Sequence, residues 1–408
     1  MSELVTDLLA PASIDTPHDV FARLRREAPV VWLPEHRAWF LSTYEAVNDG
    51  FRDARLSSDR LTPLEARIDD DRRDVLDQTF ELLRGWMVFH DPPAHQRLRE
   101  PLRRAFTPRQ VTDLRPRIVD LVEGLLDAMA EKGSCDLIAD FAFPLPAIVI
   151  AELLGVPPAD REEFKHWSDQ LSAIVFGASN RPDQAEQAAA GSAQFAEYFG
   201  WLIEKYEREP ADNLVSSLIA VTRDDPDGEG LTPSELVGAC TLLLFGGHET
   251  TTNLVGNAVH SLLSNPAELA WLTQQPDEIA GALEELHRYD GSTKLMVRIV
   301  AEDHERHGVT MKAGETVFLG VAAANRDPAM FADPDRLSLA RPDAQRHLGF
   351  GYGAHFCLGA SLARIEAQLA IGALVRRFPN LSMSGDGLEW SSVLLGRGLT
   401  TFPVDVGT

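Results

Sequence analysis

The sequence predicts a mainly helical protein with small β-sheets. Apolar residues recur at helical spacing over long stretches, most clearly over residues 232–265 and in the segment after Cys357. Short apolar and β-branched runs predict a few strands, at Val30–Trp32, Trp39–Ser42, Val297–Ala301 and Thr316–Leu319. Because no linker divides the chain and no repeat is evident, we expect one large domain over residues 1–408.

Composition excludes several classes of protein. The 408 residues carry a formal net charge of −24, which argues against a nucleic-acid binder and against docking to anionic membranes. Three cysteines are too few for a disulfide framework and fit a reducing compartment. Neither a signal-peptide pattern nor an apolar stretch long enough to span a bilayer is evident. We therefore expect a cytoplasmic protein without a membrane anchor.

The longest predicted helix begins at residues 232–235, Thr-Pro-Ser-Glu. These residues combine an N-cap, a first-turn proline and a capping-box glutamate, and the helix can run to Asn265. Two glycines, Gly246 and Gly247, interrupt its middle, and each costs roughly 1 kcal/mol relative to alanine. Such a weak point indicates that something must approach the backbone closely.

Cys357 lies where a glycine-containing loop, residues 350–356, meets a predicted helix. A helix start favours the thiolate, which is the form of cysteine that binds metals. We interpret Cys135 and Cys240 as structural cysteines. The buried stripe of the following helix is predicted to comprise Leu358, Leu362, Ile365, Leu369 and Phe378.

The pattern Phe350-x-x-Gly353-x-x-x-Cys357-x-Gly359 resembles the haem-binding signature of the cytochromes P450. The resemblance extends roughly from Pro17 to the C-terminus. Three further segments match that family in the same order: Asp91–Arg99, Gly246–Thr250 and Glu285–Arg288. It implies the P450 fold, a haem b cofactor (iron protoporphyrin IX) and Cys357 as the axial ligand of the iron.

The resemblance also implies how the haem is held. Phe350 and Gly359 belong to the cysteine loop, where Gly359 lets a flat cofactor lie against the backbone. A helix with Asp91 as its N-cap and Pro92 in its first turn would carry two of the propionate partners. The expected propionate partners are His95, Arg99, Arg298 and His355.

Further roles implied by the family concern proton delivery and the core. Gly246 and Gly247 would open a groove for dioxygen, where Thr250 would donate a hydrogen bond and Glu249 would feed protons through water. Glu285, Arg288 and a third arginine, expected to be Arg336, would lock the core that presents Cys357.

The reaction implied is the insertion of one oxygen atom of O2 into a lipophilic small molecule such as a steroid, terpenoid or polyketide. The predicted pocket residues are apolar and could equally form ordinary core. They are Met87, Val88, Phe89, Phe176, Leu242, Phe245, Leu295 and Leu394.

Electrons are expected from NAD(P)H through a ferredoxin reductase and a ferredoxin, because the chain lacks a G-x-G-x-x-G motif after a strand. We expect a monomer. A local basic patch would dock the acidic ferredoxin, and it is predicted to comprise Arg103, Arg104, Arg109, Arg346 and Arg364.

Three alternatives stay open at this point. A Cys–His hydrolase using Cys357 would leave the Gly-Gly-His-Glu-Thr helix unexplained. A haem-thiolate binding or sensing protein without turnover would not need Glu249 and Thr250. A peroxide-driven enzyme would be expected to lack that same pair, and dependence on an electron donor distinguishes it.

Overall fold

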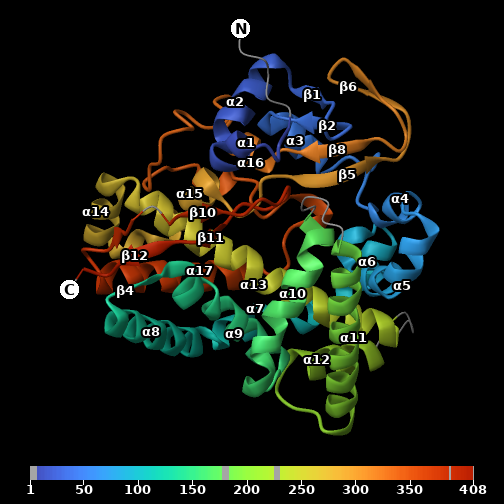
Figure 1. Ribbon diagram of the computed structural model, residues 1–408, viewed down its shortest axis with the longest axis horizontal. Coiled ribbons are helices and arrows are strands. Elements are labelled where there is room, and N and C mark those ends of the chain that lie inside the picture. The colour runs from blue at the N-terminus through green and yellow to red at the C-terminus, as the bar shows by residue number, and fades with distance from the viewer. Residues whose placement is uncertain (1–6, 177–182, 225–229, 386, 408) are drawn as a thin grey trace. The chain divides into compact units, whose positions relative to one another are not determined.

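A computed structural model of the protein describes residues 7–176, 183–224, 230–385 and 387–407. It is rich in helix and contains small sheets, as predicted (Figure 1). The chain forms two compact units. The sheet unit comprises residues 1–56, 114–146 and 249–408, and the helical unit comprises residues 57–113 and 147–248.

The main sheet of the sheet unit joins distant parts of the sequence. Strand β1 (Val30–Leu33) pairs antiparallel with β2 (Ala38–Leu41), which runs parallel to β8 (Thr316–Leu319). Strand β8 pairs antiparallel with β5 (Met296–Val300). All four predicted strands are thereby confirmed, each within one residue of the expected bounds. A two-residue strand, β3 (Leu56–Ser57), lies where the chain passes from the sheet unit to the helical unit.

One core of the sheet unit connects this sheet to the segment that precedes the cysteine loop. Buried Val317, Leu319 and Met311 pack in the same cluster as Leu348, which is 1% exposed. Helix α3 (Tyr44–Gly50) contributes Ala46 and Val47 to that cluster. The start of the cysteine loop is therefore anchored in the core of the sheet.

Helices cover the rest of the sheet unit. The C-terminal helix α17 packs against α8 and α15, and α16 packs against α2 and α3. No helix of the described residues is long and apolar enough to cross a membrane. The helices are α1 (Pro11–Asp15), α2 (Pro17–Glu27), α8 (Arg115–Lys132), α14 (Pro266–Gln274), α15 (Ile279–Asp290), α16 (Val321–Ala324) and α17 (Ala360–Arg377).

Three smaller sheets complete the sheet unit. A β6–β7 hairpin turns at His307 and Gly308, whose φ angles are 47° and 80°. The other two sheets have the strand orders β4-β12-β9 and β10-β11. The strands are β4 (Ser134–Asp136), β6 (His304–Arg306), β7 (Val309–Met311), β9 (Ser382–Met383), β10 (Glu389–Trp390), β11 (Leu399–Thr401) and β12 (Pro403–Asp405).

The helical unit packs mainly through aromatic and apolar side chains. Helix α10 lies against α11, and their contact buries Phe164, Trp167, Phe195 and Phe199. Helix α12 packs on α6, and α5 packs on α11. The helices are α4 (Leu61–Glu65), α5 (Asp70–Arg84), α6 (Ala94–Ala105), α7 (Pro108–Asp113), α10 (Arg161–Phe176), α11 (Gln184–Arg208) and α12 (Leu214–Arg223).

Two helices belong to both units, namely α9 (Pro144–Leu154) and α13 (Pro233–Leu263). The predicted capping box at the start of α13 is confirmed. The Glu235 carboxylate accepts from the Thr232 backbone N–H at 2.9 Å, and the Glu235 N–H donates to the Thr232 hydroxyl at 3.3 Å. Helix α13 then continues for 31 residues through both glycines.

The expected start of α6 was wrong. The helix begins at Ala94 and not at Pro92. The Asp91 carboxylate does not cap it. Instead it accepts hydrogen bonds from the Ser57 hydroxyl and from the Ser58 N–H, the latter at 2.8 Å. Asp91 thus fastens the segment before α6 to the chain near β3.

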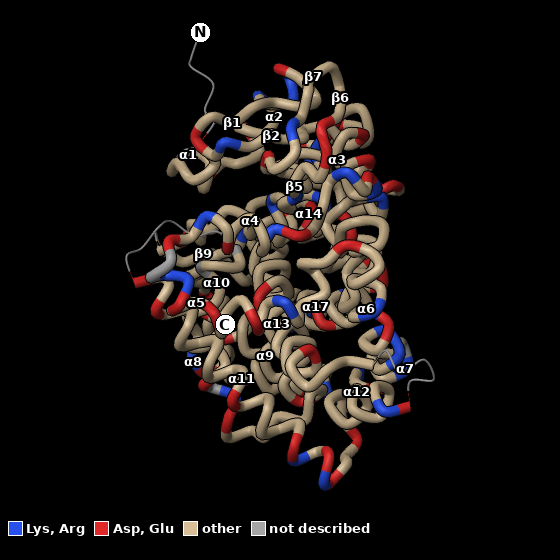
Figure 2. Tube along the Cα trace, turned by 90° about the vertical axis from the view of Figure 1, so that its right-hand side faces the viewer, with Lys and Arg blue, Asp and Glu red and all other residues tan. Residues whose placement is uncertain are grey.

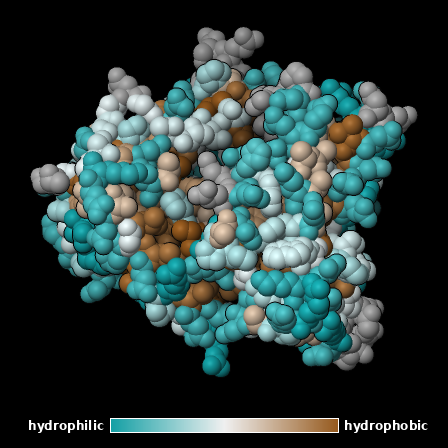
Figure 3. Space-filling model, turned by 60° about the horizontal axis from the view of Figure 1, so that its bottom comes forward, coloured by the Kyte–Doolittle hydropathy of each residue, from teal (hydrophilic) through white to brown (hydrophobic). Residues whose placement is uncertain are grey.

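The distribution of charged residues along the chain agrees with the negative net charge of the sequence. Acidic residues recur along most of the chain, and basic ones gather in places, as around α6 and α7 (Figure 2). The face drawn in Figure 3 is largely hydrophilic, with smaller apolar areas between the polar side chains.

Candidate functional site

The cysteine loop is shaped by its glycines. Gly351 and Gly353 have φ angles of 70° and 72°, a region that favours glycine. The loop closes through the Cys357 N–H, which donates to the Phe350 carbonyl at 2.9 Å. Helix α17 begins at Ala360, so Cys357 lies three residues before it, as predicted.

Cys357 differs from the other two cysteines in exposure. Its side chain is exposed, whereas Cys240 is buried and Cys135 is half-buried. Burial raises the pKa of the Cys240 thiol to about 12 and that of the Cys135 thiol to about 11, so both stay protonated near neutral pH. Of the three sulfurs, that of Cys357 is the one placed to bind a metal ion.

The rest of the loop is also open around the sulfur. Tyr352 and Phe356 are 42% and 41% exposed, unusual values for large aromatic residues. A Cβ atom added to Gly359 would meet no atom within 4 Å. The loop can therefore receive a flat apolar group against its backbone.

Two of the predicted propionate partners lie in the sheet unit with Cys357. Arg298, on β5, is buried, and its guanidinium lies over the Phe51 ring at 5.8 Å. Phe51 also borders the loop, since a Cβ atom on Gly353 would lie 3.3 Å from its carbonyl oxygen. His355 is half-buried in the loop itself. Arg298 and the cysteine loop thus both lie next to Phe51.

The other two predicted partners lie one turn apart on α6 in the helical unit. His95 is buried, whereas Arg99 is half-buried. Their spacing of four residues puts both on one face of the helix, as the sequence predicted.

The centre of α13 distinguishes the two glycines. A Cβ atom on Gly247 would lie 2.9 Å from Cγ1 of Ile150 on α9, so this glycine permits close helix packing. Gly246 is exposed, and a Cβ atom there would meet nothing within 4 Å. The group that approaches the backbone at Gly247 is thus a protein side chain, that of Ile150. The space beside Gly246 is open.

The polar residues that follow are also distinguished by burial. Thr251 and Thr252 are 3% and 5% exposed, whereas Thr250 and Glu249 are half-buried. Thr250 is therefore the one hydroxyl of the three that a small molecule can reach. Its predicted role in proton delivery stays a prediction.

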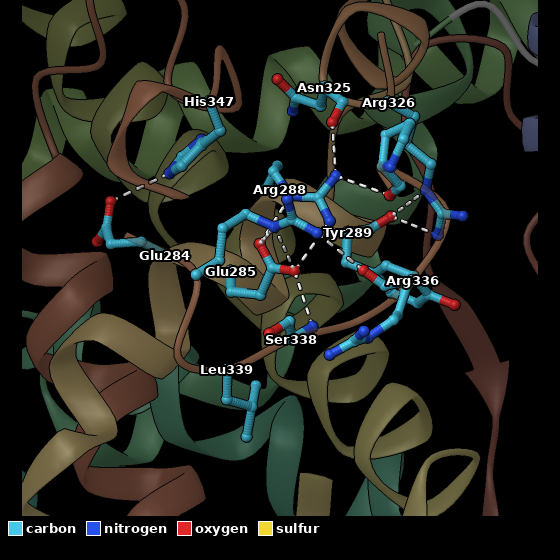
Figure 4. Close-up of polar contacts among 12 residues, drawn as sticks. Glu284, Glu285, Arg288, Tyr289, Asn325, Arg326, Arg336, Ser338, Leu339 and His347 are labelled. Carbon is cyan, nitrogen blue, oxygen red and sulfur yellow. Dashed lines mark hydrogen bonds and ion pairs between the residues drawn. The ribbon is translucent and has the colours of Figure 1, made fainter. Parts of the chain in front are cut away.

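A buried ion cluster holds α15 to the following chain (Figure 4). The side chains of Glu285 and Arg288 are fully buried and form two hydrogen bonds, of 2.6 and 2.9 Å. Arg288 also donates to the carbonyls of Asn325 and Pro334, at 2.7 and 3.0 Å. The predicted pair is confirmed as a core structure rather than a surface ion pair.

The predicted third arginine was wrong. Arg341, not Arg336, donates to the Glu285 carboxylate, at 3.0 Å. Arg336 is exposed, and its backbone carbonyl accepts a hydrogen bond from Arg341 at 3.1 Å. Arg341 also donates to the carbonyls of Ala332 and Asp333, so it holds the whole segment folded back onto α15.

A second network links α15 directly to the cysteine loop. Both oxygens of Glu284 accept from Arg364, at 2.7 and 2.8 Å, and one also accepts from His347 at 3.1 Å. Burial opposes ionisation of Glu284, but these hydrogen bonds hold the pKa of its carboxyl well below its usual range. The Arg364 guanidinium lies over the Phe350 ring at 4.4 Å, and the ring of His287 packs edge-on to it at 4.4 Å.

This network changes the interpretation of Arg364. The hydrogen bond to Glu284 raises the pKa of its guanidinium, and the charge of the Cys357 sulfur raises it further. Arg364 is therefore a half-buried neighbour of the cysteine rather than a free docking cation. Arg103, Arg104, Arg109 and Arg346 are all exposed, and of these Arg103 pairs with Glu100 and Arg109 with Asp113 at the surface.

The predicted pocket residues differ in burial. Phe89 and Phe245 pack around Trp86, with ring centroids at 6.0 and 5.2 Å, in an aromatic core. The buried members are Met87, Phe89, Phe245 and Leu295, and the half-buried ones are Val88, Leu242 and Leu394. The Phe176 side chain lies outside the described residues.

The residues around Cys357 fit an iron porphyrin. One exposed sulfur would suffice to hold its iron, because the porphyrin nitrogens would supply most of the other ligands. The described part of the chain contains no group of three or more His, Cys, Asp or Glu residues that could hold a metal ion. An open, aromatic loop and nearby Arg298 suit a flat group with carboxylate substituents.

Comparison with known proteins identifies the relatives of this chain. Residues 183–391 match the family model described as Cytochrome P450. The chain is 41% identical to the vitamin D(3) 25-hydroxylase of Pseudonocardia autotrophica, over 98% of this chain and 96% of the relative. It is 39% identical to the cytochrome P450 monooxygenase PikC of Streptomyces venezuelae, over 95% and 90%. The crystal structure of the myxobacterial cytochrome P450 CYP267B1 in complex with myristic acid superimposes with a TM-score of 0.88 and 37% identity, over 99% and 100% of the two chains.

Proposed function

Because this chain belongs to the cytochrome P450 family and is a monooxygenase of that family, we propose that it inserts one oxygen atom of O2 into a lipophilic small molecule at a haem b held by Cys357. The observation that carries the assignment of Cys357 is its exposed sulfur in a loop shaped by left-handed glycines, directly before α17. Haem, when bound, supplies the activation of O2, with two electrons and two protons for each turnover.

We infer that the residues around the sulfur keep it ionised. The Cys357 N–H is engaged by the Phe350 carbonyl, which fixes the position of the loop. Arg364 contributes a positive charge near the sulfur and is itself held by Glu284. A cation and the start of a helix both favour the thiolate over the thiol.

Thr250 would hold a proton donor where O2 binds, and Glu249 would replenish that proton through ordered water. Half-burial of both residues supports these roles, because it leaves them accessible to water without full exposure to it. The propionates would accept from His95, Arg99, Arg298 and His355.

The substrate is proposed to be largely apolar. The relatives named for vitamin D3 hydroxylation and for a myristic acid complex support this, since vitamin D3 and myristic acid are both lipophilic. Val88, Leu242 and Leu394 are the half-buried members of the predicted pocket and are the ones most able to contact a substrate. We further propose that residues 1–408 form a single P450 domain and that the protein acts as a monomer in the cytoplasm.

Electrons are proposed to come from NAD(P)H through a ferredoxin reductase and a ferredoxin. The exposed members of the predicted basic patch, Arg103, Arg104, Arg109 and Arg346, are the proposed contacts for an acidic ferredoxin. Reversing their charge should slow reduction by ferredoxin and flatten its salt dependence, whereas unchanged rates would remove them from the docking surface.

Labelled oxygen tests the reaction. The haem-loaded protein is first titrated with vitamin D3 and with myristic acid to find a compound that shifts the spin state of the iron. With that compound, a ferredoxin, its reductase, NAD(P)H and ¹⁸O₂, we expect one ¹⁸O atom in each product molecule.

Two results would favour the alternatives. Equal product formation from hydrogen peroxide alone, without NAD(P)H, would indicate a peroxide-driven enzyme. Spin-state shifts by several compounds without any product would indicate a binding protein.

A further inference from the structure

A buried lysine lies in the sheet unit between α15 and β5. Lys294 is 4% exposed, which is rare for lysine. Its ammonium donates to the Val393 carbonyl at 2.7 Å. Its backbone N–H donates to the Leu395 carbonyl at 2.8 Å, and its own carbonyl accepts from Ala322 at 3.0 Å. Two segments of the chain, one at residues 393–395 and one at Ala322, therefore fix the position of this residue.

The charge of Lys294 has no counter-ion among the described residues. No described carboxylate lies within ion-pair distance of it, and Val393 is its one hydrogen-bond acceptor there. The neighbouring Arg397 does not help, because it is a second cation and is itself paired with Asp290 at 2.6 Å. An ammonium has three donors, and a buried cation without a counter-ion is costly.

Lys294 is nevertheless charged under ordinary conditions. Burial, followed by repulsion from Arg397, lowers the pKa of its ammonium to about 8. Near neutral pH the group therefore remains mostly protonated. The protein keeps a positive charge in its interior at a position where an apolar side chain would cost less.

The neighbours of Lys294 place this charge beside predicted pocket residues. Leu295 follows it in the chain, and Leu394 lies in the segment that its side chain and backbone both contact. A bridge between Thr293 and Gly396 holds the two segments together. Lys294 and these two predicted pocket residues thus lie in the same pair of bridged segments.

We propose that Lys294 binds a carboxylate of the substrate, so that this enzyme takes amphiphilic acids, with an apolar body and one acid group. This rests on the proposed monooxygenase function and narrows its substrate class. An anionic group would supply the missing counter-charge and engage the remaining donors. A neutral hydrocarbon or alcohol would leave the charge uncompensated.

Binding of a matched pair of probes tests this proposal. Dodecanoic acid and dodecan-1-ol share an alkyl chain length and differ in charge. Their dissociation constants are measured by calorimetry and by the haem absorption spectrum, for the haem-loaded protein and for Lys294→Met. We expect the native protein to prefer the acid and Lys294→Met to bind it at least about tenfold more weakly, with the affinity for the alcohol changed by less than about threefold.

Two further variants keep the test decisive. Lys312→Met removes an exposed lysine that pairs with Asp303, and it should leave both affinities unchanged. If Lys294→Met does not fold, Lys294→Gln keeps a donor for Val393 and removes the charge, and the same loss of preference for the acid is expected.

Two outcomes would overturn the proposal. One is an unchanged ratio of the two affinities in the variants, and the other is failure of the native protein to bind the acid. The carbon monoxide spectrum of the same reduced samples reports separately on the haem ligand. A normal thiolate spectrum with no preference for acid would leave the proposed function standing and remove the role of Lys294.

Discussion

At the level of single residues, burial separates groups that the sequence presents as equivalent. Three threonines follow one another in α13, yet Thr250 alone is half-buried while Thr251 and Thr252 are in the core. Helical periodicity accounts for the difference, because adjacent residues point 100° apart around the axis. The reachable hydroxyl is thus set by the helix and not by residue type.

We expect Thr250→Ala to uncouple the reaction. Haem binding and fold should persist, since alanine favours helix. Protons would no longer be delivered at the correct oxygen, so NAD(P)H consumption should continue while product per NAD(P)H falls and hydrogen peroxide is released. Glu249→Gln should instead slow the whole cycle. The buried Thr251→Ala is the control, and full coupling in Thr250→Ala would remove that residue from proton delivery.

The charged core offers a second test at this scale. Arg341→Ala should lower the free energy of unfolding by about 3 kcal/mol, because it strips a buried carboxylate of one of its two arginines. Arg336→Ala should change it by less than about 0.5 kcal/mol, as at other exposed positions. Urea unfolding of both variants measures the difference. An equal loss in both would restore Arg336 to the cluster.

Sequence reasoning recovered the chemistry of single residues better than their partners. The pair Glu285–Arg288 follows from helical spacing, but its third member depends on how residues 332–341 fold back, which no local pattern records. Lys294 was missed for a similar reason, because nothing around it in the sequence distinguishes a buried lysine from an exposed one. Glu285 lies in the middle of the chain and, once buried, needs a positive charge beside it. That need could have drawn attention to Arg341.

At the level of elements, the sequence predicted the position of a helix start or a strand correctly where the pattern of residues was long enough. The capping box at 232–235 and four strands of the main sheet lie where the sequence placed them. The small sheets were missed, because strands of two or three residues show no alternation. The start of α6 was predicted too early, because the Asp91 carboxylate accepts hydrogen bonds from Ser57 and Ser58 and does not cap the helix.

The double glycine of α13 gives a test at this scale. Gly247→Ala should destabilise the fold by about 1–3 kcal/mol, because its Cβ would lie too close to Ile150. Gly246→Ala has no such neighbour and should be neutral or stabilising by up to about 1 kcal/mol. Thermal or urea unfolding measures both. The cost of Gly247→Ala should shrink in an Ile150→Ala background, and an unchanged cost there would exclude this contact as its cause.

At the level of the whole chain, the sheet unit ties both ends of the sequence to its middle. Nε2 of His18, on α2, lies 3.1 Å from Asp290 at the end of α15, and Arg397 donates to the same carboxylate at 2.6 Å. Arg397 also reaches the Ile14 carbonyl at 2.9 Å. Segments up to 383 residues apart are thereby fastened around one buried carboxylate.

This cluster predicts loss of stability in acid. Burial, followed by repulsion from Arg326, lowers the pKa of His18 to about 4, whereas in the unfolded chain it is about 6.5. The unfolded state therefore takes up a proton that the folded state refuses, and stability falls as pH drops from about 6.5 towards 4, by about 3 kcal/mol. His18→Gln should reduce this dependence, whereas His166→Gln, at an exposed position, should not. Urea unfolding at pH 7.5 and 5 measures it, and an equal dependence in both variants would exclude His18.

The identity of the iron ligand is tested most directly by the absorption of the reduced, carbon-monoxide-bound protein. The native protein and Cys135→Ser should both show the red-shifted band of a thiolate-ligated haem. Cys357→His should retain some haem and lose that band, because the imidazole is neutral where the thiolate was charged. Survival of the red-shifted band in Cys357→His would contradict the assignment of Cys357 as the axial ligand.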